Sequence, residues 1–209
     1  MNRFLTFSFI LLLLFSSCGT YRYPNASGIR ESAAQELNSY YTDTTQQWVY
    51  RTKLQAFDQH MQGSVTIKAL GRNEHRITFV SDFDQVLFDV HLLPNGYELE
   101  GATPSLGKRA VAKEMVNIFR TLTAQRFATS AVMFAGQQQY YPVYVQDDCY
   151  YVVKERKVER IRQVKGAQEY LEIVYQTWNV KDVPTSIAIT HKKYPITIDL
   201  ALEAKQSSL

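Results

Sequence analysis

Residues 47–57 read QWVYRTKLQAF, and apolar and polar side chains alternate along them. In an extended chain Trp48, Tyr50 and Leu54 point to one side, and Arg51 and Lys53 point to the other. This period of two predicts a strand with one buried face, and it identifies the sheet as the framework of the fold.

The same alternation continues after this strand. Residues 61–69 repeat it, and residues 75–79, 86–92 and 97–99 follow after short polar turns. The Pro-Asn-Gly sequence at 94–96 is a strong hairpin signal. Five successive strands with short connections predict an antiparallel meander.

The hydrophobic period changes at residues 105–123. Val111, Met115, Ile118 and Phe119 recur at helical spacing, and Ser105, which follows a proline, is the expected N-cap. We therefore predict one amphipathic helix whose apolar face packs on the sheet.

The rest of the chain is also rich in strand patterns. Residues 31–42 are expected to form helical turns, and residues 127–136 fit no single pattern. Six further strands are predicted, at residues 140–146, 149–154, 157–164, 168–177, 185–191 and 196–203. The predicted fold class is α+β: a single curved antiparallel sheet, or half-barrel, of 10–11 strands, with helix covering its concave face.

The first residues resemble a secretory signal peptide that ends in a lipid-attachment site. Arg3 precedes an apolar stretch at residues 4–15, and the small residues Ser16 and Ser17 precede Cys18. We predict a signal peptide at 1–17, a flexible tether at 18–30 that is lipidated on Cys18, and one domain at 31–209. An ordinary signal peptide with a chance cysteine, or an uncleaved N-terminal anchor, are the alternatives.

The residues after Cys18 predict the location of the mature protein. Neither an aspartate nor an acidic cluster follows this cysteine, so the signals for inner-membrane retention and for surface export are missing. The predicted location is the periplasmic face of the outer membrane, with the lipid on Cys18 as the contact to the membrane.

Charge and cysteine content narrow the function classes further. The 23 Lys and Arg residues nearly balance the 20 Asp and Glu residues, which gives no electrostatic footprint for nucleic acid. If Cys18 carries lipid, Cys149 has no cysteine partner within the chain, so no disulfide framework is expected. Cys149 lies in an apolar strand pattern, and we expect a buried, inert thiol.

No residue pattern suggests catalysis. His60, His75, His91 and His191 neither pair at helical spacing nor fall in a metal-ligand motif. We therefore expect no catalytic residues, no metal site and no cofactor, and a hydrolase is the least favoured class.

One stretch resembles a known family. Residues 47–101 are similar to the opening sheet of the LolA/LolB family, including its LolB-like lipoproteins. The similarity consists of WVY at 48–50, GSVTI at 63–67, the turn SDFDQ at 81–85, where LolB-type chains carry a Gly-Pro-Leu-Gly-Gln-like sequence, and PNGYEL at 94–99. The helix and later strands follow in family order.

The resemblance implies a half-barrel whose apolar cavity accommodates acyl chains, and a turn residue that helps to deliver lipoproteins to the membrane. The strand residues whose alternation directs them inward, together with one face of the helix, are predicted to line this ligand cavity. They are Trp48, Tyr50, Leu54, Val65, Ile67, Phe79, Phe88, Val90, Met115, Ile118 and Phe119. The matching turn residue is Phe83, flanked by Asp82 and Asp84. Either it projects and touches membrane or client, or it folds back under the sheet as a plug.

The sequence thus favours an outer-membrane lipoprotein that binds acyl chains or a similar lipid and takes part in lipoprotein or lipid transfer. A periplasmic LolA-like carrier is a further expected partner. The alternative is a non-catalytic scaffold or assembly lipoprotein with a solid core. The pattern leaves open which ligand is bound, and whether the pathway is general sorting or a dedicated one.

The lipid anchor gives the first testable prediction. Cys18→Ala removes the thiol that would carry the lipid, so the variant should leave the membrane fraction and should escape cleavage at residue 17. Fractionation and mass spectrometry of the mature N-terminus measure both effects. A variant that stays with membranes and is cleaved normally would show that Cys18 carries no anchor.

Overall fold

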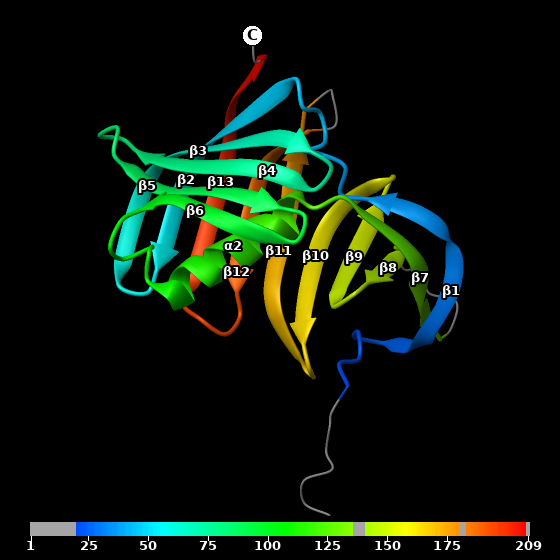
Figure 1. Ribbon diagram of the computed structural model, residues 1–209. Coiled ribbons are helices and arrows are strands. Elements are labelled where there is room, and N and C mark those ends of the chain that lie inside the picture. The colour runs from blue at the N-terminus through cyan, green and yellow to red at the C-terminus, as the bar shows by residue number, and fades with distance from the viewer. Residues whose placement is uncertain (1–19, 136–140, 180–182, 208–209) are drawn as a thin grey trace, which may run out of the picture.

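The chain folds as one antiparallel sheet against which a helix packs (Figure 1). The structure is a computed structural model, and it describes residues 20–135, 141–179 and 183–207. The helix is α2 (Arg109–Thr123). The strands are β1 (Ala26–Leu37), β2 (Gln46–Ala56), β3 (Gln59–Gly71), β4 (Glu74–Ser81), β5 (Val86–Leu93), β6 (Gly96–Ala102), β7 (Arg126–Phe134), β8 (Val143–Gln146), β9 (Cys149–Lys154), β10 (Lys157–Lys165), β11 (Gln168–Trp178), β12 (Pro184–His191) and β13 (Ile196–Ser207).

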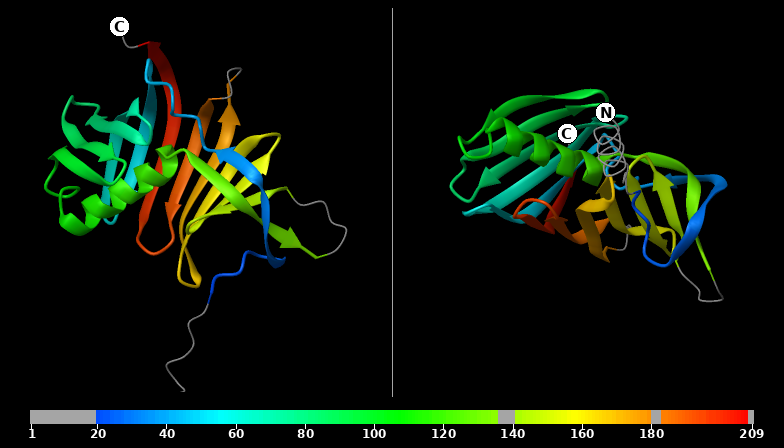
Figure 2. Two further views of the ribbon diagram at one scale, coloured as in Figure 1. Left: turned by 45° about the vertical axis from the view of Figure 1, so that its right-hand side comes forward. Right: turned by 90° about the horizontal axis from the view of Figure 1, so that it is seen from below.

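The order of strands confirms the predicted antiparallel sheet. It runs β1-β7-β8-β9-β10-β11-β12-β13-β2-β3-β4-β5-β6, and β2 to β6 form the expected meander. The last strand, β13, pairs with β2 and so joins the two halves of the sheet. Figure 2 shows the sheet curving around α2, so the helix covers the concave face.

The number of strands differs from the prediction, because the sheet has 13 strands rather than 10 or 11. The two additional strands are β1 and β7, which pair with each other at one edge. Strand β1 occupies the end of the predicted tether and most of residues 31–42, where helical turns were expected. Strand β7 lies in the stretch that fitted no pattern.

The side chains of β2 alternate between buried and more exposed positions, as the sequence predicts. Every second residue from Trp48 to Ala56 is buried, and the residues between them are exposed or half-buried. At Gly63 of β3 the backbone of β4 lies so close that a Cβ would stand 1.9 Å from the Val80 carbonyl oxygen. Glycine is therefore required there for β3 and β4 to pair.

The helix begins later than predicted, and Ser105 is not its N-cap. Lys108 precedes the first turn without a side-chain cap, and the Ser105 hydroxyl lies 3.2 Å from that of Thr103. Residues 103–107 form a separate turn, closed by a hydrogen bond from the Gly107 N–H to the Thr103 carbonyl. The apolar face of α2 does pack on the sheet, with Met115, Ile118 and Phe119 fully buried.

Asn38 fixes the end of this helix. Its side-chain amide donates hydrogen bonds to the carbonyl oxygens of Leu122 (2.9 Å) and Ala124 (3.0 Å), which the helix leaves without partners at its C-terminus. Its amide oxygen accepts a hydrogen bond from the Tyr175 hydroxyl of β11 (2.8 Å). Asn38 has a φ of 58°, a left-handed conformation that asparagine tolerates better than most residues. One buried side chain thus connects the end of β1, the helix and the centre of the sheet.

Asn38→Asp should destabilise the protein by roughly 2–4 kcal/mol, because the carboxylate keeps the shape and the acceptor but loses the donors to two buried carbonyls. Urea unfolding of the purified protein measures the change. Gln55→Glu, at an exposed position of β2, is the control and should change stability by less than about 0.5 kcal/mol. Equal effects of the two substitutions would contradict a special role for Asn38.

Candidate functional site

The residues predicted to line a ligand cavity all belong to the main core. Each is 0–2% exposed, and together they pack into one cluster between α2 and strands β2 to β5. They lie on one face of the sheet or helix, as their spacing in the sequence predicts. None of them lines either of the two cavities described below. Their contact with a ligand stays a prediction, and a ligand there would have to separate the helix from the sheet.

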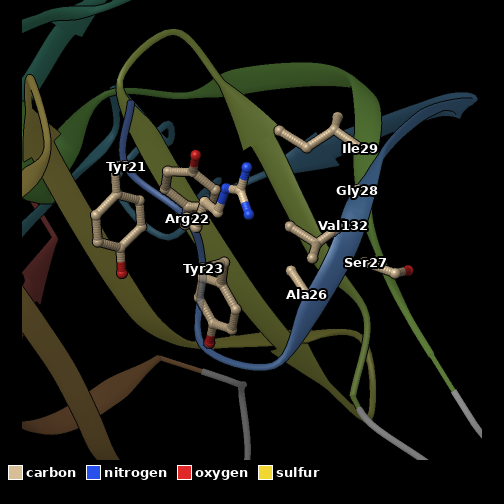
Figure 3. Close-up of a pocket in the computed structure, with 9 residues that line it drawn as sticks. Tyr21, Arg22, Tyr23, Ala26, Ser27, Gly28, Ile29 and Val132 are labelled. Carbon is tan, nitrogen blue, oxygen red and sulfur yellow. The ribbon is translucent and has the colours of Figure 1, made fainter. Parts of the chain in front are cut away.

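A cavity does lie at the N-terminal end of the domain (Figure 3). Its volume is about 380 Å³, within the range of roughly 300–1,000 Å³ of small-molecule pockets. It lies between residues 21–29, strand β7 and strand β9. The lining side chains and glycine are Tyr21, Arg22, Tyr23, Ala26, Ser27, Gly28, Ile29, Val132 and Tyr150. We call this space the N-terminal cavity.

The N-terminal cavity lies on the face of β9 that α2 does not cover. Tyr150 and Tyr151 are adjacent in β9 and therefore point to opposite faces. Tyr151 belongs to the main core, whereas Tyr150 packs in a second, smaller cluster with Val132, Val143 and Val164. Apolar residues consequently occupy both faces at this end of the sheet.

Two tyrosines hold the N-terminal segment against this second cluster. The Tyr21 hydroxyl donates a hydrogen bond to Glu169 (2.8 Å), and its ring lies edge-on to Tyr150 at 5.1 Å. Tyr23 stacks on the same Tyr150 ring at 5.6 Å, and the Arg162 guanidinium lies 5.4 Å from the Tyr23 ring centre. Residues 21 and 23, predicted to be part of a flexible tether, are therefore docked on the domain.

These tyrosines present neutral rings to the cavity. Burial, with the hydrogen bond to Glu169, raises the pKa of Tyr21 to about 12. Burial also raises the pKa of Tyr23 and of Tyr150. All three hydroxyls remain protonated at neutral pH, and Arg22 supplies the charged group in the lining. Such a lining suits an apolar molecule with a single negative or polar end.

The sequence carried a weak signal for this site. Tyr21 and Tyr23 have the i, i+2 spacing that directs two side chains to one side of an extended chain. Their partners Tyr150 and Glu169 lie more than 120 residues further along. Only the folded sheet brings these groups together.

Phe83 projects from the turn between β4 and β5, and its side chain is 93% exposed. The Ser81 hydroxyl accepts hydrogen bonds from the backbone N–H groups of Phe83 (3.3 Å) and Gln85 (3.2 Å), and Asp84 takes a left-handed φ of 58°. Phe83 therefore does not fold back under the sheet as a plug. Its contact with membrane or client stays a prediction.

The carboxylates beside Phe83 are not equivalent. Asp82 forms an ion pair with Arg51 of β2, with 2.7 Å between Arg51 Nη2 and Asp82 Oδ2. This contact compensates one of the two negative charges that would oppose an approach to an anionic surface. The pair is exposed on both sides, so it contributes little to stability.

Burial raises the pKa of the Cys149 thiol to about 11, which keeps it protonated. In the part of the chain that the structure describes, no three His, Cys, Asp or Glu side chains are placed to bind a metal ion together. None of the helices described there has the length and apolar character needed to cross a membrane.

Comparison with known proteins finds solved structures that are similar to this chain at low sequence identity. No protein-family model matches the chain, and no curated protein matches it in sequence. Among solved structures, the chain is similar to a LolA superfamily protein, NE2245 from Nitrosomonas europaea, with 8% identity, coverage of 82% of this chain and 90% of that chain, and a TM-score of 0.46.

Two further solved structures are similar at the same level. A DUF1329 family protein from Desulfovibrio piger has 7% identity, coverage of 80% and 88%, and a TM-score of 0.42. A putative outer membrane lipoprotein-sorting protein domain from Vibrio parahaemolyticus has 7% identity, coverage of 79% and 86%, and a TM-score of 0.40. A LolA superfamily protein is thus among the solved structures to which this chain is similar. Similarity of this degree says nothing about a ligand or a site.

Phe83→Glu should leave the free energy of unfolding within about 0.5 kcal/mol of wild type, because the side chain is exposed. If Phe83 touches membrane, the variant should also bind lipid vesicles more weakly, and co-sedimentation measures this. Leu99→Glu, at a half-exposed position of β6, is the control. A variant with unchanged stability and unchanged vesicle binding would remove Phe83 from the membrane-contact hypothesis.

Proposed function

We propose that this chain is a non-catalytic lipoprotein of the periplasmic face of the outer membrane, which binds an acyl chain or similar lipid and takes part in lipoprotein or lipid transfer. The observation that carries the proposal is the N-terminal cavity. Its lining combines neutral rings and aliphatic groups with the polar Ser27 and the charged Arg22, and it has the volume of a small-molecule site.

The position of the cavity supports a lipid as the ligand. Tyr21, which lines it, follows the predicted lipid-attachment residue Cys18 by three positions. A lipid anchor on Cys18 would hold this end of the domain near the membrane surface. An acyl chain that leaves the membrane would then reach the cavity without crossing much water, and each buried methylene contributes about 0.8 kcal/mol.

The lining also suits the head of such a ligand. Arg22 is exposed at the cavity, and its guanidinium can pair with a carboxylate or phosphate. A fatty acyl group with one anionic end therefore matches both parts of the lining. A LolA-like carrier that delivers the ligand remains the partner expected from the sequence resemblance.

A scaffold function is the second candidate, and the packed main core favours it. The residues that the family resemblance assigns to a ligand cavity are instead in close contact with one another. A protein whose interior is solid under α2 could serve assembly without binding lipid. Lipid binding at the N-terminal cavity distinguishes the two candidates.

Ala26→Phe should reduce the affinity for palmitate roughly tenfold or more, because the larger ring occupies the N-terminal cavity. Displacement of a fluorescent fatty acid from the purified protein measures the affinity. Ala33→Phe is the matched control, since Ala33 lies on the same strand, is exposed and lines none of the described cavities.

Three outcomes are informative. Loss of binding in Ala26→Phe alone supports the proposed site. Binding that persists in both variants places the ligand elsewhere, and wild-type protein without any affinity for palmitate or lipid favours the scaffold.

A further inference from the structure

A second cavity, of about 440 Å³, lies where three distant parts of the chain meet. The β3–β4 turn contributes Arg72 and Asn73, the β5–β6 turn contributes Pro94 and Asn95, and the end of α2 with the start of β7 contributes Arg120 and Arg126 among others. Three arginines but neither aspartate nor glutamate line this cavity. We call it the arginine pocket.

Neutral groups hold each arginine in place. The Arg120 guanidinium donates hydrogen bonds to the carbonyl oxygens of Leu93 (2.8 Å) and Gly96. The Arg72 guanidinium lies 5.5 Å from the centre of the Phe127 ring. Arg126 acts on the buried Tyr151, whose pKa burial raises and the positive charge of Arg126 lowers. The three positive charges are thus positioned without a carboxylate.

Several other arginines of the chain are paired with carboxylates. Arg51, Arg76 and Arg162 each lie within 4 Å of a carboxylate oxygen. Among the described residues, no such ion pair is found for the three arginines of the pocket.

The carboxylates near the pocket have other partners. Glu36 accepts a hydrogen bond from the Gln125 side chain (2.7 Å), and Glu74 lies 2.8 Å from the ring of His91. Among the described residues, neither carboxylate forms an ion pair with an arginine of the pocket.

The positive charges also act on one another. Burial lowers the pKa of Arg120, and the positive charge of Arg126 lowers it further. Both side chains are half-buried, so water screens their repulsion only in part. An anion between them would remove this repulsion.

We propose that the arginine pocket binds a phosphate-type oxyanion, such as a phosphomonoester or a phospholipid headgroup, between the guanidinium groups of Arg72, Arg120 and Arg126. A guanidinium presents five N–H donors in a planar fork that matches phosphate oxygens. Arg120 uses donors of both terminal nitrogens on carbonyl groups and has others left for a ligand. The side chains of Asn73 and Thr123 also line the pocket and can add polar contacts.

The pocket is remote from the N-terminal cavity, so this site is independent of the proposed lipid site. Ala26 pairs with Phe134 at one end of β1 and β7, and Leu37 pairs with Arg126 at the other. Strand β1 spans 12 residues, which corresponds to about 35 Å along the strand. In Figure 1 the first described residues, in dark blue, lie below β1, whereas the chain passes from α2 into the upper end of β7. A membrane at the N-terminal end would therefore lie on the far side of the domain from this pocket.

The test is calorimetric titration of the purified protein with inorganic phosphate and glycerol phosphate at low ionic strength. Wild type should bind, and Arg126→Gln and Arg72→Gln should each lose roughly tenfold or more in affinity. Arg72 is exposed, so its variant tests the site even if Arg126→Gln fails to fold. Arg109→Gln, at the exposed start of α2, removes the same charge elsewhere and should bind within about twofold of wild type.

Vesicles distinguish the source of the phosphate group. Phosphatidylglycerol mixed equally with phosphatidylcholine is compared with phosphatidylcholine alone, using wild type, Arg126→Gln and Arg109→Gln. Binding of soluble phosphate without preference for the anionic vesicles identifies a soluble ligand. Preference for anionic vesicles that Arg126→Gln alone abolishes identifies a headgroup. Absence of both effects in wild type, or equal losses in Arg109→Gln, would overturn the proposal.

Discussion

The carboxamide of Asn38 is the interaction on which the layered structure depends. A helix packed on a curved sheet leaves its last carbonyl groups facing the protein interior, where water cannot reach them. Asn38 satisfies two of these carbonyls and accepts a hydrogen bond from Tyr175, so helix, sheet and the end of β1 are joined at one buried point. The neighbouring pair of Tyr41 and Tyr50 hydroxyls, 2.9 Å apart, extends this polar contact into β2. The centre of the interface is apolar. Other polar contacts of α2 lie towards its margins, where Asn117 pairs with Gln163 and Glu114 accepts a hydrogen bond from the Tyr170 hydroxyl.

The curvature of the sheet explains how the arginine pocket forms. The β3–β4 turn and the start of β7 would lie far apart in a flat sheet with this strand order. Nine steps separate β7 from β4 in the sheet, and at about 4.8 Å per step this corresponds to roughly 43 Å. Because the sheet curves around α2 (Figure 2), the two regions are in contact, and the Gln125 N–H donates a hydrogen bond to the Asn73 side chain (2.8 Å). The positive charges meet there because of this curvature.

Much of this fold follows from the sequence, and the exceptions have a physical cause. Strands β2, β3 and β4 alternate between a buried and a solvent face, so a period of two is visible. Strand β1 is buried only at Leu37, and its register against β7 shifts twice. Small residues and register shifts remove the hydrophobic period of two from β1. Its partner at the edge of the sheet, β7, lies some 100 residues away, so no turn or hairpin sequence nearby indicates the pairing. Ser105 was a plausible cap from its neighbours, but the turn at 103–107 takes its place.

The site was harder to predict than the fold. The alternation of apolar and polar residues indicates which side chains share a face of the sheet, but it does not indicate how closely they pack. Trp48, Phe88 and Ile118 point inward as predicted, and a solid core and a ligand cavity require the same apolar residues there. A solid core and a ligand cavity differ in the volume left unfilled between the side chains. This volume depends on how far the whole sheet curves around the helix. At the N-terminal end the sheet carries apolar residues on both faces, and only one face is covered by a helix. The docked tyrosines cover the other face incompletely, because two rings cannot fill a space closed on one side by β7 and on the other by β9. The cavity is therefore a consequence of leaving a second apolar face to a short segment of chain.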